Sequence, residues 1–125
     1  MIELTKKPLD PIAVIDSVRG NPANGAVVSF IGSLRNLSSD GKPLRHAEIE
    51  LEAGAVRARL KELSEEICVK WNLSQLSIAH RYGRIGVGEL ILVVAISAKQ
   101  RKEAFEACQY TIDRVKKLHR LIEIV

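Results

Sequence analysis

The residues of this sequence that are suited to chemistry are cations, rather than nucleophiles or metal ligands. The chain has no serine–histidine–acid grouping, no close pair of catalytic carboxylates and no histidine cluster. Cys68 and Cys108 lie far apart and lack the CxxC spacing of a zinc site. Cys108 falls on the apolar side of a predicted helix, which favours a small buried thiol over a reactive one. We therefore expect no metal site, and a candidate site that binds anions.

Lys116 is the lysine with the most distinctive position. It follows Phe105 by eleven positions, and at about 100° per residue this places it about 20° from Phe105 after three helical turns. We therefore expect it at the boundary of the buried stripe, whereas Lys117 lies a further ~100° around the helix. Such a lysine either serves a site or merely extends its stem over apolar neighbours. The spacing alone does not decide between the two.

Arg101 and Arg35 occupy two further positions where anions are commonly bound. Arg101 begins the predicted last helix, where free N–H groups and the helix dipole attract negative charge. Arg35 follows a predicted strand and opens a loop, which is a frequent place for ligand contacts. A single surface arginine usually serves solubility, so each position is only a candidate by itself.

The composition fits one globular, cytoplasmic domain that spans residues 1–125. The chain is 46% hydrophobic and 27% charged, which is typical of a folded domain. No apolar run approaches the roughly 18 residues of a membrane span, and the N-terminus has no signal-peptide pattern. We therefore expect a cytoplasmic protein without a membrane partner. The net charge of +4 suits an anionic ligand. Only 4% of residues are aromatic, too few for base stacking, so we expect no nucleic-acid partner.

The elements that must position these residues follow an α+β pattern. Alternating and β-branched runs predict strands over residues 2–5, 25–34, 46–52, 75–81 and 90–97. Periodicity and capping signals predict helices over residues 11–19, 55–71 and 101–118. The polar segment 35–43 is either a hairpin connection or a mobile loop, and the glycine-rich link 82–89 is a turn rather than a phosphate cradle. This order predicts a mostly antiparallel sheet with flanking helices.

Apolar residues at helical spacing predict which side of each long helix is buried. The predicted stripes are Val56, Leu60, Leu63, Ile67 and Trp71 in the middle helix, and Phe105, Cys108, Ile112 and Val115 in the last helix.

Three stretches resemble the signatures of a known family. They are GAVVSFIGSLRN (25–36), HRYGRIGVGE (80–89) and RKEAFEACQYTID (101–113). In this order and spacing they resemble the molybdopterin synthase large (catalytic) subunit family, also called molybdopterin converting factor subunit 2. The resemblance implies an α/β-hammerhead-like fold. It also implies a homodimer flanked by two small ubiquitin-like sulfur-carrier subunits, which makes a heterotetramer.

The resemblance also implies a sulfurtransferase of molybdenum cofactor biosynthesis. Each small subunit would insert a C-terminal Gly-Gly thiocarboxylate into the large subunit, and sulfur would pass to cyclic pyranopterin monophosphate to form the molybdopterin dithiolene. No cofactor would be bound permanently, because the pterin phosphate is the substrate. By position, Lys116 falls on the family's catalytic lysine. Arg35, Gln100 and Arg101 fall on its substrate-binding positions.

The sequence departs from the family pattern at several positions. Gln100 stands where the family usually has histidine, and an ungapped placement puts Glu123 where a second important lysine belongs. A gapped placement offers His119 or Arg120 instead. The family's basic C-terminal tail is also missing. These departures leave an alternative open: a divergent, non-catalytic homologue that binds the small subunit or a pterin phosphate without turnover.

Overall fold

The computed structural model describes residues 1–125, and its longest strands form a four-stranded sheet. The strands lie in the order β1 (Ile2–Thr5), β4 (Gln75–Arg81), β6 (Leu90–Ala98) and β2 (Ala26–Ser33). Only β1 and β4 pair in parallel, while β6 is antiparallel to both of its neighbours. The predicted α+β class with mostly antiparallel pairing is confirmed.

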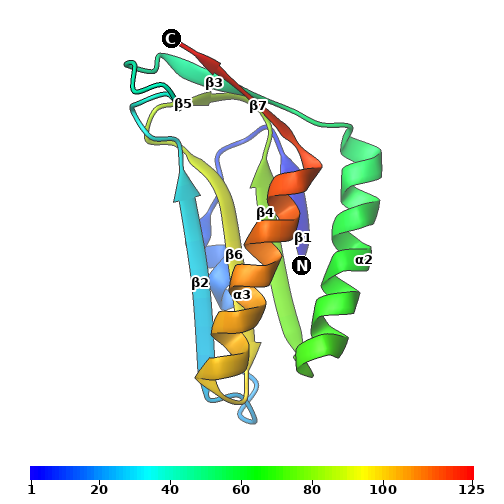
Figure 1. Ribbon diagram of the computed structural model, residues 1–125. Helices are drawn as coiled ribbons and strands as arrows, with labels where there is room; N and C mark the ends of the chain where they lie inside the picture. Colours follow the sequence, from blue (N-terminus) through cyan, green and yellow to red (C-terminus); the bar gives the residue numbers. More distant parts are fainter.

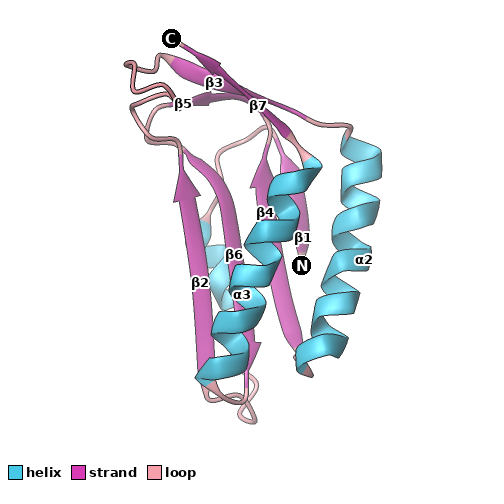
Figure 2. Cartoon of the chain, viewed as in Figure 1, coloured by secondary structure: helices cyan, strands magenta, loops and turns pink.

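The central strand β6 is buried on both faces, because helices cover both sides of the sheet. Successive side chains of a strand point to opposite faces. Val94 and Ile96 pack into the main core, with α2 (Ala53–Trp71) and α3 (Arg101–Val115). Val93 and Ala95 point the other way, into a smaller core formed with α1 (Pro11–Asp16). Figure 2 shows α2 and α3 together on one face of the sheet and α1 behind it.

A second sheet of three strands lies across one end of the first (Figure 1). Its order is β5 (Gly83–Gly86), β3 (His46–Glu50) and β7 (Arg120–Ile124), and both pairings are antiparallel. The hammerhead-like architecture is confirmed. The prediction that residues 82–89 form only a turn is wrong, and the sequence pattern gave no strand after the last helix.

The short strand β5 forms because of its tertiary partners. Ile85 pairs with Ala47 of β3 and is fully buried. With Leu34, Leu44 and Ile49 it fills a separate small core beneath the second sheet. The flanking glycines give no strand signal in the sequence, so only this packing reveals the strand.

The helix boundaries follow local capping chemistry. The Asp10 carboxylate accepts from the Ala13 N–H at 3.2 Å, and α1 then ends at Asp16, earlier than the predicted residue 19. The Glu52 carboxylate caps α2 in the same way through the Ala55 N–H at 2.6 Å. At its other end α2 stops at Asn72, whose φ of 52° is left-handed. None of the helices combines the length and the apolar character needed to cross a membrane.

The buried side of α3 is rotated from the predicted one. Cys108 and Val115 are buried as expected, but Phe105 is 60% exposed. The residues that face the sheet instead are small, namely Ala104, Ala107 and Thr111. Because small side chains let the helix approach the sheet closely, Phe105 is turned outward over the edge strand β2. There it lines a shallow hollow with Val28 and Phe30.

Candidate functional site

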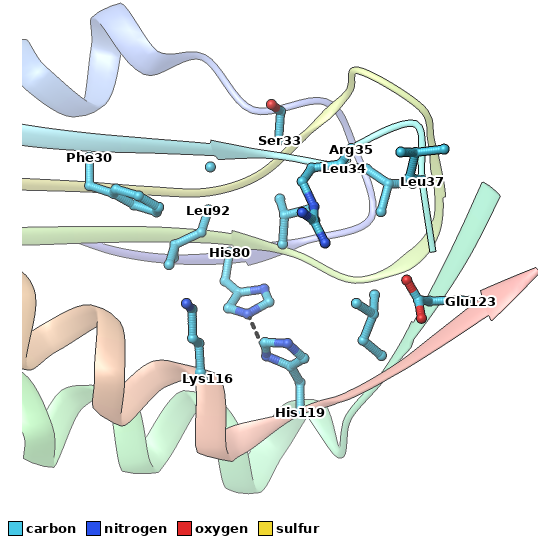
Figure 3. Close-up of a pocket in the computed structure, with 13 residues that line it drawn as sticks. Phe30, Ser33, Leu34, Arg35, Leu37, His80, Leu92, Lys116, His119 and Glu123 are labelled. Carbon is cyan, nitrogen blue, oxygen red and sulfur yellow. Dashed lines mark hydrogen bonds between the residues drawn. The ribbon is translucent and has the colours of Figure 1, made fainter. Parts of the chain in front are cut away.

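The largest hollow of the molecule lies where the two sheets meet. It has a volume of about 530 Å³. The end of β2, the loop that follows it, β4, β6 and the chain after α3 all contribute to its wall (Figure 3). The pocket brings Arg35 and Lys116 together, two residues from opposite ends of the sequence that were both predicted to serve a site. Apolar Phe30, Leu34 and Leu92 form much of the remaining lining.

Lys116 reaches this pocket through a change of helix type. The α-helix ends at Val115, and Lys116–Leu118 form a 3₁₀ turn, η1. In a 3₁₀ helix residues i and i+3 eclipse one another, so Lys116 and His119 face the same side. Both line the pocket and Lys117 does not. Lys116 and Phe105 are both exposed, so the expectation that a buried stripe runs through Phe105 beside Lys116 is wrong.

A pair of histidines that no pattern in the sequence predicts lines the pocket beside Lys116. His80 is 1% exposed at the end of β4, and its Nε2 lies 3.1 Å from Nδ1 of His119. The two rings meet edge to face with centroids 4.8 Å apart (Figure 3). His119 had been named only as a gapped substitute for a lysine. A histidine inside a buried strand was the one signal that could have drawn attention to His80.

Burial keeps both imidazoles neutral at physiological pH. Desolvation, with a further contribution from His119, lowers the pKa of His80 from 6.5 to about 4. Desolvation also lowers the pKa of His119, and the nearby charge of Lys116 lowers it further. The pocket therefore contains the basic side chains of Arg35 and Lys116 next to a neutral histidine pair.

Glu123 is the anion of the pocket and fixes the loop after β2. Its carboxylate accepts from the Ser39 N–H at 3.1 Å and from the Ser39 hydroxyl at 2.8 Å. These two Ser39 groups, and more weakly Arg35, lower the pKa of Glu123. A bridge between Leu37 and Pro43 closes the same loop. Segment 35–43 is therefore an anchored hairpin-like connection, and Glu123 serves it as an acceptor.

Gln100 and Arg101 lie at the other end of α3, away from this pocket. Gln100 is the N-cap residue of the helix and lines a separate hollow of about 240 Å³ with Trp71 and Glu103. The 15 residues of α3, at about 1.5 Å each, separate the two helix ends by roughly 22 Å. Within one chain, two of the four predicted site residues, Arg35 and Lys116, share a pocket. The other two, Gln100 and Arg101, lie away from it.

Comparison with known families decides the relationship. The family model described as "MoaE protein" matches residues 4–118. The chain belongs to the MoaE protein family. The resemblance seen in the three sequence stretches is thereby confirmed. The matched range ends at Leu118, so His119 and Glu123 lie just outside it.

Relatives of this MoaE-family chain share most of its length. The molybdopterin synthase catalytic subunit of Thermoplasma volcanium is 35% identical over 92% of this chain and 82% of the relative. That of Bacillus subtilis is 34% identical over 93% of this chain and 73% of the relative.

The crystal structure of molybdopterin synthase from Staphylococcus aureus superposes with a TM-score of 0.89 at 28% identity, over 98% of this chain and 89% of that one. A complex of subunits 1 and 2 of the molybdopterin-converting factor from Helicobacter pylori has the same fold, with a TM-score of 0.79 at 16% identity, over 99% of this chain and 84% of that one.

Proposed function

We propose that this MoaE-family chain is the catalytic subunit of a molybdopterin synthase. As a sulfurtransferase it would move sulfur from the C-terminal thiocarboxylate of a small ubiquitin-like subunit to cyclic pyranopterin monophosphate, and so form the molybdopterin dithiolene. The observation that carries this proposal is the pocket of about 530 Å³ that holds Arg35 and Lys116 together. The names of the relatives support the same activity.

The charges of the pocket suit the two reactants. Both the pterin phosphate and the thiocarboxylate are anions, and a guanidinium binds phosphate through two parallel hydrogen bonds. Arg35 is assigned to the phosphate. Lys116 is assigned to the acyl group of the partner's tail, where its ammonium stabilises the oxyanion that forms when sulfur is released.

The partner must supply the sulfur, because the thiols of this chain are unsuited to the task. Burial raises the pKa of Cys108 to about 11, so this thiol is not ionised at neutral pH. Burial also raises the pKa of Cys68. Neither cysteine lines the pocket. A chain that provides cations and accepts sulfur from a second protein fits these facts.

Gln100 and Arg101 are assigned to the substrate site of a second copy. Roughly 22 Å of helix separates them from Lys116. They can therefore line only the corresponding pocket of a second chain in a dimer. In a twofold-symmetric dimer each chain would lend its α3 N-terminus to its partner. The outward-facing Phe105, together with Val27 and Ile31 of the edge strand β2, gives an exposed apolar edge on which two copies can pair.

The proposed assembly is a heterotetramer of this homodimer and two small sulfur-carrier subunits. The H. pylori complex joins two converting-factor subunits in that organism, and we assign a corresponding Gly-Gly-tailed partner to this chain. We place the assembly in the cytoplasm, without a nucleic-acid or membrane partner. No cofactor is held permanently, because the pterin phosphate enters as substrate.

Glu123 favours one alternative function. Glu123, which accepts from Ser39, stands where an ungapped placement on the family pattern expects a lysine, and Gln100 cannot act as an acid. A homologue that binds the small subunit or the pterin phosphate without turnover would tolerate both changes.

A turnover assay separates these functions. Purified chain, thiocarboxylated small subunit and cyclic pyranopterin monophosphate are combined, and molybdopterin is measured by fluorescence after oxidation. The synthase proposal expects product, and expects none when the partner lacks its last two glycines. Tail-dependent binding without any product would establish the non-catalytic alternative instead.

A further inference from the structure

The hydrogen bond between the two histidines has a defined direction. Nδ1 of His80 lies 2.8 Å from the backbone carbonyl oxygen of Arg81. A carbonyl only accepts, so Nδ1 of His80 carries the proton and, in the neutral ring, Nε2 is bare. Nδ1 of His119 faces this bare nitrogen at 3.1 Å. His119 must therefore donate from Nδ1.

This arrangement leaves a lone pair on Nε2 of His119. A neutral imidazole carries one proton, and in His119 that proton is held on Nδ1 by His80. Nε2 of His119 makes no hydrogen bond within the chain and is not shut off from solvent. Since His119 lines the pocket, this nitrogen is available to a molecule bound there.

We propose that His119 is a further catalytic residue of this pocket, a general base whose Nε2 takes a proton from the water that frees sulfur from the partner. This inference rests on the proposed synthase function. Once the thiocarboxylate sulfur has bonded to a substrate carbon, it is still attached to the acyl carbon of the partner's last glycine as a thioester. Water must break that link before the sulfur belongs to the substrate alone.

Hydrolysis of this thioester requires only water and His119. The water oxygen bonds to the acyl carbon while Nε2 of His119 takes one of its protons. The tetrahedral intermediate then collapses, and the carbon–sulfur bond breaks with its electron pair staying on sulfur as a thiolate. The partner leaves with a carboxylic acid, which loses the second proton to solvent, and Nε2 of His119 then releases the first proton to solvent as well. No oxidant or reductant is needed.

The neighbours of His119 are arranged for this role. Lys116 lies on the same side of the 3₁₀ turn, where its charge stabilises the oxyanion of the intermediate. Desolvation and the charge of Lys116 lower the pKa of His119, so the ring enters the reaction in its unprotonated, base form. His80 fixes the tautomer from behind. The other charged groups of the pocket are Arg35 and Glu123, and Glu123 is occupied by Ser39.

The test uses the complete assembly with the His119→Gln variant, in a single turnover with thiocarboxylated partner and pterin phosphate. General base catalysis contributes about 100- to 10,000-fold, so product release should slow at least about 100-fold. A covalent adduct of partner and substrate should accumulate and be visible by mass spectrometry. His46→Gln is the matched control, because His46 lies in β3 beside Glu48 and outside the pocket. Turnover of His119→Gln at the wild-type rate would overturn the proposal.

A second measurement needs no activity. Nitrogen-15 NMR of the free protein at neutral pH distinguishes the two neutral tautomers of each histidine. The expected result is a protonated Nδ1 and a bare Nε2 in His119, and likewise in His80. A protonated Nε2 in His119 would overturn the inference even if the wild type turns over. Absence of wild-type turnover would instead contradict the proposed function, and the tautomer would still decide whether His119 presents a base.

Discussion

Arg101 is the first residue of α3 and Lys116 directly follows its last, so the two lie 15 positions apart at opposite ends of this helix. Both were assigned to one substrate site by family resemblance, yet in one chain roughly 22 Å of helix separates them. The two assignments agree only if each site is built from two chains. If they do agree, the proposed homodimer is required for activity, because a single chain would lack part of the site.

Shared sites predict complementation between two inactive variants. Lys116→Ala and Arg101→Ala should each lose activity as homodimers. In a mixed dimer one site carries both defects and the other carries neither. Random pairing makes half of the dimers mixed, so co-expression should restore about a quarter of wild-type turnover. The recovered activity should copurify with dimers that carry both affinity tags.

Complementation fails if the site is contained in one chain. Mixed dimers without any activity, although both tags are present in them, would contradict the shared-site assignment of Arg101.

Arg35 is predicted to bind the substrate phosphate. A charge-assisted hydrogen bond contributes about 1.5–3 kcal/mol, so Arg35→Ala should weaken binding of the pterin phosphate about 10- to 150-fold. Calorimetry of the homodimer measures this directly. Arg84→Ala is the control, because Arg84 is exposed on β5 and outside the pocket. If Arg35→Ala and Arg84→Ala bind the pterin phosphate with equal affinity, Arg35 does not bind the substrate phosphate.

Glu123 is predicted to fix the loop and to oppose the substrate charge. Glu123→Gln keeps an acceptor for Ser39 but removes the negative charge near Arg35. Arg35 is then no longer attracted to a neighbouring carboxylate, so the affinity for the pterin phosphate should rise slightly. Glu123→Ala should also speed amide hydrogen exchange at Ser39, whose N–H loses its acceptor. Unchanged exchange at Ser39 would show that the carboxylate does not hold the loop.

The buried histidine predicts a loss of stability in mild acid. Unfolded His80 takes a proton near pH 6.5, but folded His80 takes one only near pH 4. Its pKa is lowered on folding, so the unfolded state binds more protons and stability falls as the pH drops from 6.5 toward 4. Between pH 7.5 and pH 5 this amounts to about 2 kcal/mol. Urea unfolding at the two pH values measures it, and His46→Gln should lose as much as the wild type. A wild-type free energy of unfolding that does not change would contradict a neutral, buried His80.

The sequence predicted those elements whose signal is local. The runs that became β2 and β6 are long and rich in β-branched residues, and Asp10 caps α1 through the nearby Ala13 N–H. The strand β5 could not be predicted in this way, because Ile85 is held by residues from other segments. The orientation of Phe105 also depends on the sheet, because Ala104 and Ala107 fit closely against it.

The candidate site was predictable in its charges but not in its histidines. Arg35 and Lys116 were found from their positions and from family resemblance. His80 and His119 meet only because the end of β4 lies under the 3₁₀ turn after α3. No spacing along the chain signals that contact. The division of the site between two ends of α3 likewise follows from helix length and not from motif order.

The most direct test of the account is the rate of molybdopterin formation by Lys116→Ala, measured with saturating thiocarboxylated partner beside wild type and Lys117→Ala. Loss of a positioned oxyanion-stabilising group costs about 100-fold or more in kcat. We expect such a loss for Lys116→Ala, with dimerisation and partner affinity retained. Lys117→Ala should keep a near wild-type rate, because Lys117 lies outside the pocket. Turnover of Lys116→Ala at the wild-type rate would contradict the account.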